Sequence, residues 1–250
     1  IGALSDPSDD VRLQAARVLQ EFDGETVAAG LADALQDSSN TVAAAAADSL
    51  AELKSPEAAL PLLPLTTHEK PFVRANALRA LKGLRHPEAL KPGLAALQDP
   101  EPEVRMQAVG VLGYLQMEEA LHALILAGRD SDIEVRRAAV GALAFSNSST
   151  VSEALIKAIS DEAWRVREMA AETIGKLKFA DGTDALMSVT EDEYWQVRLQ
   201  SVRSLGKIGV ARAIPAIVGA LEHSISNLRK DAAAALGEIA DAGALPYLEK

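Results

Sequence analysis

The chain repeats one short pattern at a constant step of 31 residues, and this repeat limits the possible fold more than any other feature. The dipeptide Val-Arg marks the pattern, which recurs in eight copies, two of them altered: Val11-Arg12, Val42-Ala43, Val73-Arg74, Val104-Arg105, Val135-Arg136, Val166-Arg167, Val197-Arg198 and Leu228-Arg229. No insertion or deletion interrupts them. A period of roughly 20–50 residues is typical of arrays of stacked units, because one unit alone cannot bury its apolar face.

Small and apolar residues follow the dipeptide at a spacing that predicts an α-helix. Counted from its first residue, position +4 is Ala in every copy except Ser201, and position +8 is always Leu or Ile. Position +11 is apolar except at Ser146. Positions 0, +4, +8 and +11 lie on one face of a helix. We therefore expect a helix, here named helix B, from about position −3 to about +12. A second apolar segment before each turn, as in 89–97 and 213–221, predicts a partner helix A.

These helices predict an all-α, right-handed solenoid of helix pairs. The register gives seven complete pairs between a lone helix B at the start and a lone helix A at the end, in one continuous domain over residues 1–250. We expect a piece of a longer chain, because the sequence starts at Ile1 inside a repeat. Glycine at position +9 predicts close helix packing, with an early helix end as the alternative; it stands at Gly113, Gly175, Gly206 and Gly237.

Composition excludes several classes of protein. Hydrophobic residues make up 48% of the chain, which excludes a disordered protein, and the absence of Cys excludes disulfide scaffolds and Cys-based metal sites. No apolar run is long enough to insert into a membrane. The net charge of −11 disfavours binding to nucleic acid. None of this identifies the compartment, for which a cytoplasmic location is the expectation.

The sequence carries no recognisable catalytic or metal-binding motif. It lacks a nucleophile elbow, a phosphate-binding loop, a dinucleotide fingerprint and a His-Glu-x-x-His motif. The only His-Glu dipeptide, His68-Glu69, falls in a predicted turn. We therefore expect no enzyme activity, no cofactor and no transition metal at His68, His86, His122 or His223.

The segment Asp-Pro-Glu-Pro-Glu-Val-Arg-Met-Gln-Ala-Val-Gly-Val-Leu-Gly (99–113) resembles the HEAT-like repeats first named for phycobilisome lyase subunits. That family contains bilin lyase subunits and many scaffolds. The resemblance implies a ladder of turn Asp and Arg residues between successive repeats, interrupted at Ala43, His68 and His223. Its members here would be Asp99, Arg105, Asp130, Arg136, Asp161, Arg167, Asp192 and Arg198.

The resemblance also implies that the B helices line a concave side. Positions +2, +3, +6 and +10 face away from the apolar stripe, and in the central repeats they include Met and aromatic residues. We predict a polypeptide-binding patch there, with Gly110 and Gly141 leaving room for an inserted side chain. Its residues are Asn76, Arg79, Met106, Gln107, Tyr114, Arg137 and Phe145. The alternative is that Tyr114 and Phe145 turn inward and fill gaps.

Trp164 and Trp195 occupy the same position one repeat apart and form a second candidate. They either stack a ligand or cover the joint between repeats.

The function predicted from these features is that of a non-catalytic scaffold. Its partner is a protein or peptide, possibly the rest of its own longer chain. The enzyme-class alternative is a bilin lyase subunit, which absorbance after incubation with a bilin would reveal. Nucleic-acid binding is disfavoured further because the outward B-helix positions hold seven basic and seven acidic residues, so they form no basic track.

Overall fold

The computed structural model describes residues 1–249 and divides the chain into two compact units, Ile1–Ala127 and Gly128–Lys250, which we describe separately. All regular elements of the described residues are helices. None of these helices is long and apolar enough to cross a bilayer. The predicted fold class, an all-α solenoid of helix pairs, is confirmed.

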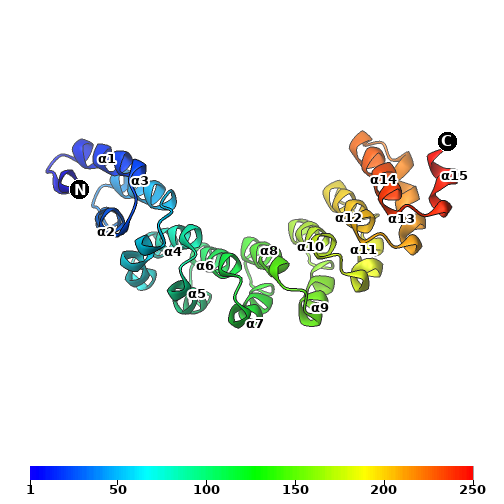
Figure 1. Cartoon of the computed structure of the whole chain (residues 1–250), viewed down its shortest axis with the longest axis horizontal. Helices are drawn as coiled ribbons and strands as arrows, with labels where there is room; N and C mark the ends of the chain where they lie inside the picture. The colour runs from blue at the N-terminus through cyan, green and yellow to red at the C-terminus, as the bar shows by residue number, and fades with distance from the viewer. Residues whose placement is uncertain (250) are drawn as a thin grey trace. The chain divides into compact units, whose positions relative to one another are not determined.

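The first unit consists of two layers of helices (Figure 1). The B layer contains α1 (Asp9–Val18), α3 (Asn40–Ala51), α4 (Pro71–Leu84) and α6 (Pro102–Leu115). The A layer contains α2 (Glu25–Ala34), the 3-10 segment η3 (Pro56–Thr67), α5 (Leu90–Ala96) and α7 (Glu118–Ala127). Successive B helices pack on one another, α1 on α3, α3 on α4 and α4 on α6. The B helices begin and end within a few residues of the predicted bounds.

The second unit repeats this arrangement. Its B layer contains α8 (Ile133–Ala142), α10 (Trp164–Leu177), α12 (Trp195–Ile208) and α14 (Ser226–Ile239). Its A layer contains α9 (Ser149–Ala158), α11 (Thr183–Ser188), α13 (Ile214–Val218) and α15 (Leu245–Leu248). Here α8 packs on α10, α10 on α12 and α12 on α14.

One predicted A helix has a different form. Residues 56–67 wind as a 3-10 helix, with Pro61 and Pro64 inside it. Proline lacks the N–H that an α-helix needs, and its ring clashes with the carbonyl four residues earlier. The tighter winding avoids a continuous α-helical ladder through both prolines, so this difference follows from the sequence.

The predicted apolar stripe forms the core of each unit. The residues at +8 are all buried, including Leu50, Leu81 and Leu112 in the first unit. Position +4 is buried in every copy after the first. The first copy differs, with Val11 and Phe22 exposed, because no preceding B helix of the described residues packs against α1.

Two of the four glycines at +9 allow a close approach of B helices. A Cβ added to Gly206 would lie 2.7 Å from Ala235 Cα, and one added to Gly175 would lie 2.8 Å from Ser204 Cα. These contacts involve backbone atoms, so the neighbouring helix cannot give way easily. Gly237 faces open space instead. Close packing therefore explains Gly175 and Gly206, both of which lie inside their helices.

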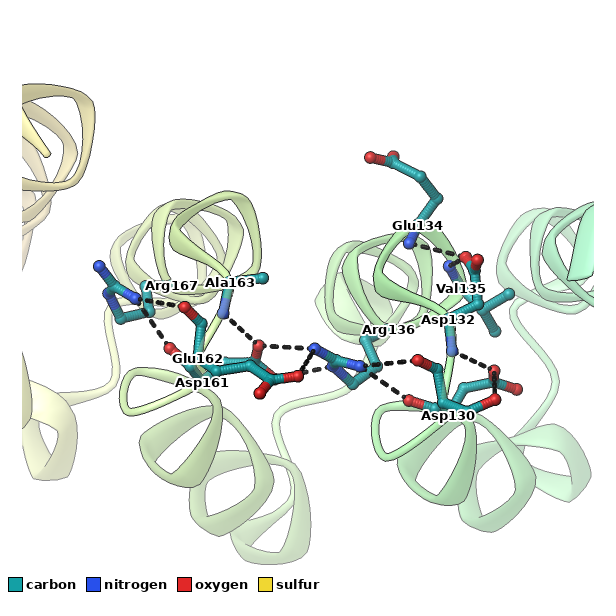
Figure 2. Close-up of polar contacts among 10 residues, drawn as sticks. Asp130, Asp132, Glu134, Val135, Arg136, Asp161, Glu162, Ala163 and Arg167 are labelled. Atoms are coloured by element: carbon teal, nitrogen blue, oxygen red, sulfur yellow. Dashed lines mark hydrogen bonds and ion pairs between the residues drawn. The ribbon is translucent and has the colours of Figure 1, made fainter.

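An arginine at position +1 joins the turn of its own repeat to the turn of the next repeat, as Figure 2 shows for Arg136. Its Nη1 donates to the carbonyl oxygens of Asp130 at 3.0 Å and Ser131 at 3.3 Å. Its Nε donates to Asp161 Oδ2 at 2.9 Å, and the other carboxylate oxygen accepts the N–H of Ala163. Each rung of this ladder therefore holds two turns together.

The same rung recurs in both units. Nε donates to a carboxylate at 2.7 Å in Arg12–Asp37, Arg74–Asp99 and Arg167–Asp192. In the first unit Arg105 donates to the carbonyl of Asp99 at 2.9 Å. In the second unit Asp130 accepts the N–H of Asp132 at 2.8 Å.

The two histidines that replace the turn aspartate keep its hydrogen bond to the backbone of the turn. Nδ1 of His68 accepts the N–H of Lys70, and Nδ1 of His223 accepts that of Ile225, as the aspartate oxygen does elsewhere. Nε2 of His68 lies 3.1 Å from Gln36 Oε1, to which it can donate. Nε2 of His223 lies 3.0 Å from Arg198 Nη1, another donor. A neutral imidazole has one acceptor nitrogen, so His223 cannot accept from both Ile225 and Arg198, and the Arg198 rung is weaker than a carboxylate rung.

The rungs change the pKa of their members. The Arg12 hydrogen bond lowers the pKa of Asp37. For Asp99 and Asp192, burial raises the pKa, but hydrogen bonds from Arg74 and Arg167 and from backbone N–H groups outweigh it, so both pKa values are lowered. The carboxylates are therefore held in their charged form.

Acid should weaken the protein through these rungs. A carboxylate whose folded pKa lies below its unfolded pKa stabilises the fold above about pH 4, and this contribution is lost as pH falls through the folded pKa. We expect the melting temperature to drop as pH is lowered below about 4. Asp99→Asn should be less stable at pH 7 and show a shallower acid slope.

Asp33→Asn is the matched control, because Asp33 is an exposed aspartate of α2 without an ion pair to any described residue. Its acid slope should match that of the unmodified protein. An unchanged slope in Asp99→Asn, measured by circular dichroism from pH 7 to about pH 2, would contradict the assignment.

Candidate functional site

Tyr114 lies on α6 at position +10 and remains 47% exposed. Two cations of α4 approach its ring: Lys82 Nζ lies 5.4 Å and Arg85 Cζ 5.2 Å from the ring centroid. Both distances fall within the range of cation–π contacts. Tyr114 therefore does not fill a gap in the core, and its ring lies at the surface of the first unit beside two cations.

The sequence of α4 explains how both cations reach one ring. Lys82 and Arg85 are three residues apart and thus neighbours on the helix surface. Arg85 ends the helix in the left-handed conformation, with φ 52°, and donates its N–H to the Leu81 carbonyl at 3.2 Å. Cations near a helix C-terminus are stabilised by the helix dipole, which favours both residues at this end of α4.

Neither Lys82 nor Arg85 forms an ion pair with any of residues 1–249. Arg79, one turn earlier on α4, pairs with Asp48 at 3.1 Å, yet its Nε is buried without a hydrogen-bond partner within residues 1–249. Lys82 and Arg85 therefore bring positive charge to the Tyr114 ring that no ion pair within residues 1–249 neutralises.

The amides predicted to pair with a peptide backbone already have partners within their own helices. Asn76 donates to the carbonyl of Phe72 at 2.8 Å, and Gln107 donates to Glu103 at 2.8 Å. Met106 is half-buried beside them. These contacts use one N–H of each amide, and the carboxamide group has further donor and acceptor capacity for a bound peptide.

The space above the two central glycines is occupied. A Cβ on Gly110 would lie 2.9 Å from Lys82 Cδ, and one on Gly141 would lie 3.0 Å from Met169 Sδ. The expectation that these glycines leave room for an inserted side chain was therefore wrong. A long side chain from the neighbouring repeat covers each glycine, and only movement of that flexible chain would open the space.

The predicted residues of the second unit are less exposed. Arg137 pairs with Glu134 at 2.8 Å, and this hydrogen bond is the largest cause of the lowered pKa of Glu134. Phe145 lies on the 3-10 turn η5 (Leu143–Phe145) that follows α8, and its side chain is half-buried. Burial and the neighbouring Glu172 raise the pKa of Glu168 on the same face.

An aromatic stack lies at the N-terminal ends of α10 and α12. Trp164 stacks on Tyr194, with centroids 5.5 Å apart and ring planes at 16°. Arg165 lies over the indole and Arg167 over the phenol ring. The partner of Trp164 is therefore Tyr194, and Trp195 contributes a separate exposed ring.

A groove of about 660 Å³ runs beside this stack. Asp132, Glu134 and Glu162 line it, together with Arg165. Asp132 caps α8 by accepting the N–H groups of Glu134 and Val135, as Figure 2 shows, and Glu162 lies 3.2 Å from Arg136. The carboxylates of the groove thus have partners within the second unit.

Within residues 1–249, no three His, Asp or Glu side chains are grouped so that they could hold a metal ion. Three functional candidates were missed by sequence reasoning: Lys82, Arg85 and Tyr194. They lie at positions +9, +12 and −3, outside the outward positions that were compared. The signal that could have found them is their position within the repeat. Lys82 and Arg85 stand within two positions of Tyr114 of the next repeat, and Tyr194 stands within one position of Trp164 of the preceding repeat.

Comparison with known proteins gives a family for this chain. A model described as HEAT repeats matches residues 1–71, 59–132, 122–193 and 183–250. No curated protein sequence matches the chain.

Several solved structures share the fold at low sequence identity. The chain is similar to the Escherichia coli protein YIBA, with TM-score 0.70 and 18% identity over 96% of this chain and 91% of that one. It is similar to a chain in the CpcE–CpcF complex of phycocyanin lyase from Nostoc sp., with TM-score 0.53 and 16% identity over 95% and 92%. A structure of Kap95p bound to RanGDP gives TM-score 0.66 and 15% identity over 94% of this chain and 39% of that one.

Proposed function

Because the chain belongs to the HEAT-repeat family, whose matches extend from residue 1 to residue 250, we propose that it is a non-catalytic protein-interaction scaffold. The proposed partner is a polypeptide segment bound on the outward face of the B helices, the face expected to be concave. Domains built from stacked repeats offer long, regular surfaces suited to extended partners.

The exposure of Tyr114 is the observation that carries this proposal. An aromatic side chain that is half exposed on a regular helix face, and that lies among long flexible cations, is typical of an interface anchor. The ring offers a rigid apolar surface at small entropic cost. We assign Tyr114 the central contact of the first unit, and we expect Asn76, Arg79, Met106 and Gln107, at the other outward positions of α4 and α6, to contribute smaller contacts along the same helices.

Arg137 and Phe145 form a separate contact on the second unit in this proposal. Both residues are partly buried, and Arg137 already has a carboxylate partner, so we expect a smaller contribution from them. The Trp164–Tyr194 stack and Trp195 remain a second candidate surface of that unit.

The neighbours in structure are compatible with a binding role. CpcE and CpcF form a complex, and Kap95p binds RanGDP. At 15–16% identity these likenesses show the fold alone. The lyase-subunit alternative has only this likeness in its favour, whereas the scaffold proposal also has the exposed site at Tyr114.

Tyr114→Ala should abolish most binding. Peptides selected from a displayed random library on the unmodified protein should bind the variant more weakly by about 2 kcal/mol or more, since truncation of a central aromatic anchor typically has this effect. Helicity and melting temperature should remain nearly unchanged, because the ring lies outside the core. Titration calorimetry and circular dichroism measure the two quantities.

Phe72→Ala is the matched control. Phe72 is an aromatic residue of the same unit with the same 47% exposure, but it lies at the start of α4, away from the Lys82 end. Its variant should bind the selected peptides normally. Equal losses in both variants, or none in Tyr114→Ala, would refute the proposed site.

A further inference from the structure

We infer that the segment bound at Tyr114 is acidic, with an Asp or Glu carboxylate of the partner held between Lys82 and Arg85. This inference rests on the proposed function and specifies the chemistry of its partner. It assigns a role to two residues that the ladder and the core do not use.

The first step of the argument is the convergence of two cations on one ring. Lys82 Nζ and Arg85 Cζ both lie within 5.4 Å of the Tyr114 centroid. Two cations that share one ring repel each other, and the negative ring face compensates only part of that repulsion. A carboxylate close to both cations would reduce the repulsion and gain charge-assisted hydrogen bonds.

The second step is that neither Lys82 nor Arg85 has a carboxylate partner within the first unit. Residues 1–127 contain 18 Asp and Glu against 10 Lys and Arg, so acidic side chains are abundant. Every ladder arginine described in this unit has hydrogen-bond partners, whereas Lys82 and Arg85 have no ion pair with residues 1–249. Two neighbouring basic side chains without an ion pair therefore make the local charge positive in a unit whose net charge is negative.

The third step concerns the rest of α4. Arg79 continues the basic face one turn away, and the only carboxylate on it, Asp48, has a highly exposed side chain. Exposed pairs of this kind are weak, so a partner carboxylate can replace Asp48 with little loss. Arg79, Lys82 and Arg85 thus form a basic ridge of α4, with Tyr114 beside its C-terminal end.

The helix dipole explains why basic residues lie near the end of α4, but it does not explain why two of them lie beside the ring of Tyr114. Arg17, Lys176 and Lys207 also lie in the last turns of B helices. The described structure places two cations over one tyrosine only at Tyr114. The combination of apolar ring and paired cations suits an acidic segment that also carries an apolar side chain.

The test uses the complete chain and a displayed random-peptide library. Peptides are selected on the unmodified protein and kept only if they fail to bind Tyr114→Ala. We expect the retained peptides to be rich in Asp and Glu and to bind more weakly as salt is raised. Their affinity should fall about tenfold on the double variant Lys82→Gln, Arg85→Gln, which removes both charges but keeps polar side chains.

Lys91→Gln in α5 is the control, because Lys91 is an exposed lysine of the A layer in the same unit. It should leave the affinity unchanged. Lys82→Glu with Arg85→Glu should shift the selected peptides toward Lys and Arg.

Four outcomes would overturn the inference. Tyr114-dependent peptides that are neutral or basic would refute the acidic partner but not the scaffold proposal. The same conclusion would follow if the peptides bound the Gln double variant with unchanged affinity. Failure to recover any Tyr114-dependent peptide refutes both. A single-stranded oligonucleotide that competes through Lys82, Arg85 and Tyr114 would assign the site to nucleic acid instead.

Discussion

Leu112→Ala is expected to lower the free energy of unfolding by about 2–5 kcal/mol. The side chain is fully buried on α6, and its Cδ2 would lie 3.0 Å from a Cβ added to Gly93 of α5, so it joins the B layer to the A layer. Its truncation removes apolar contacts and leaves a cavity that rigid helices cannot fill. Urea unfolding followed by circular dichroism measures the loss.

Leu126→Ala provides the comparison, because Leu126 of α7 is 52% exposed in the same unit. Its truncation should cost less than about 0.5 kcal/mol. A loss below about 1 kcal/mol for Leu112→Ala would mean that the apolar stripe has been assigned to the wrong residues.

Arg167→Met should be the most damaging change in the ladder, at about 3 kcal/mol. The variant leaves the carboxylate of Asp192, whose side chain is 7% exposed, without its charged partner. It also leaves the carbonyls of Asp161 and Glu162 without their donor. Loss of one member of a buried pair is costly because the other charge remains desolvated.

Two further variants make this prediction specific. Arg165→Met removes an exposed arginine beside it, which pairs with Glu134 at 3.2 Å, and should cost less than about 1 kcal/mol. Adding Asp192→Asn to Arg167→Met should recover part of the stability, since the uncompensated charge is gone. Equal losses for Arg165→Met and Arg167→Met in thermal and urea unfolding would argue against the ladder as a source of stability.

The fold was largely predictable because each repeat carries the same information. The constant 31-residue step identified the buried Leu positions and the B helices without any tertiary data. The 3-10 form of 56–67 was also visible in principle, since Pro61 and Pro64 cannot both continue an α-helix.

The site was less predictable because side-chain pairing depends on rotamers. Arg79 and Asp48 stand at the same position in successive repeats, which is a neighbour relation, but either could also have pointed to solvent. The choice of Tyr194 over Trp195 as partner of Trp164 depends on one residue of register at a helix start. Repeat position gives proximity, and only the structure gives direction.

The ladder also determines how strongly neighbouring repeats unfold together. Arg12 and Arg74 each couple their own turn to the turn 25 residues later, but Ala43 has no guanidinium, and His68 contacts Gln36 instead. Cooperativity across that junction of the first unit therefore depends on apolar packing, neutral hydrogen bonds and the exposed Arg79–Asp48 ion pair rather than on a ladder rung. Local opening should separate there at lower free energy than at a carboxylate rung. A ligand that bridges α3 and α4 would consequently raise the cooperativity of this unit more than one bound to either side alone.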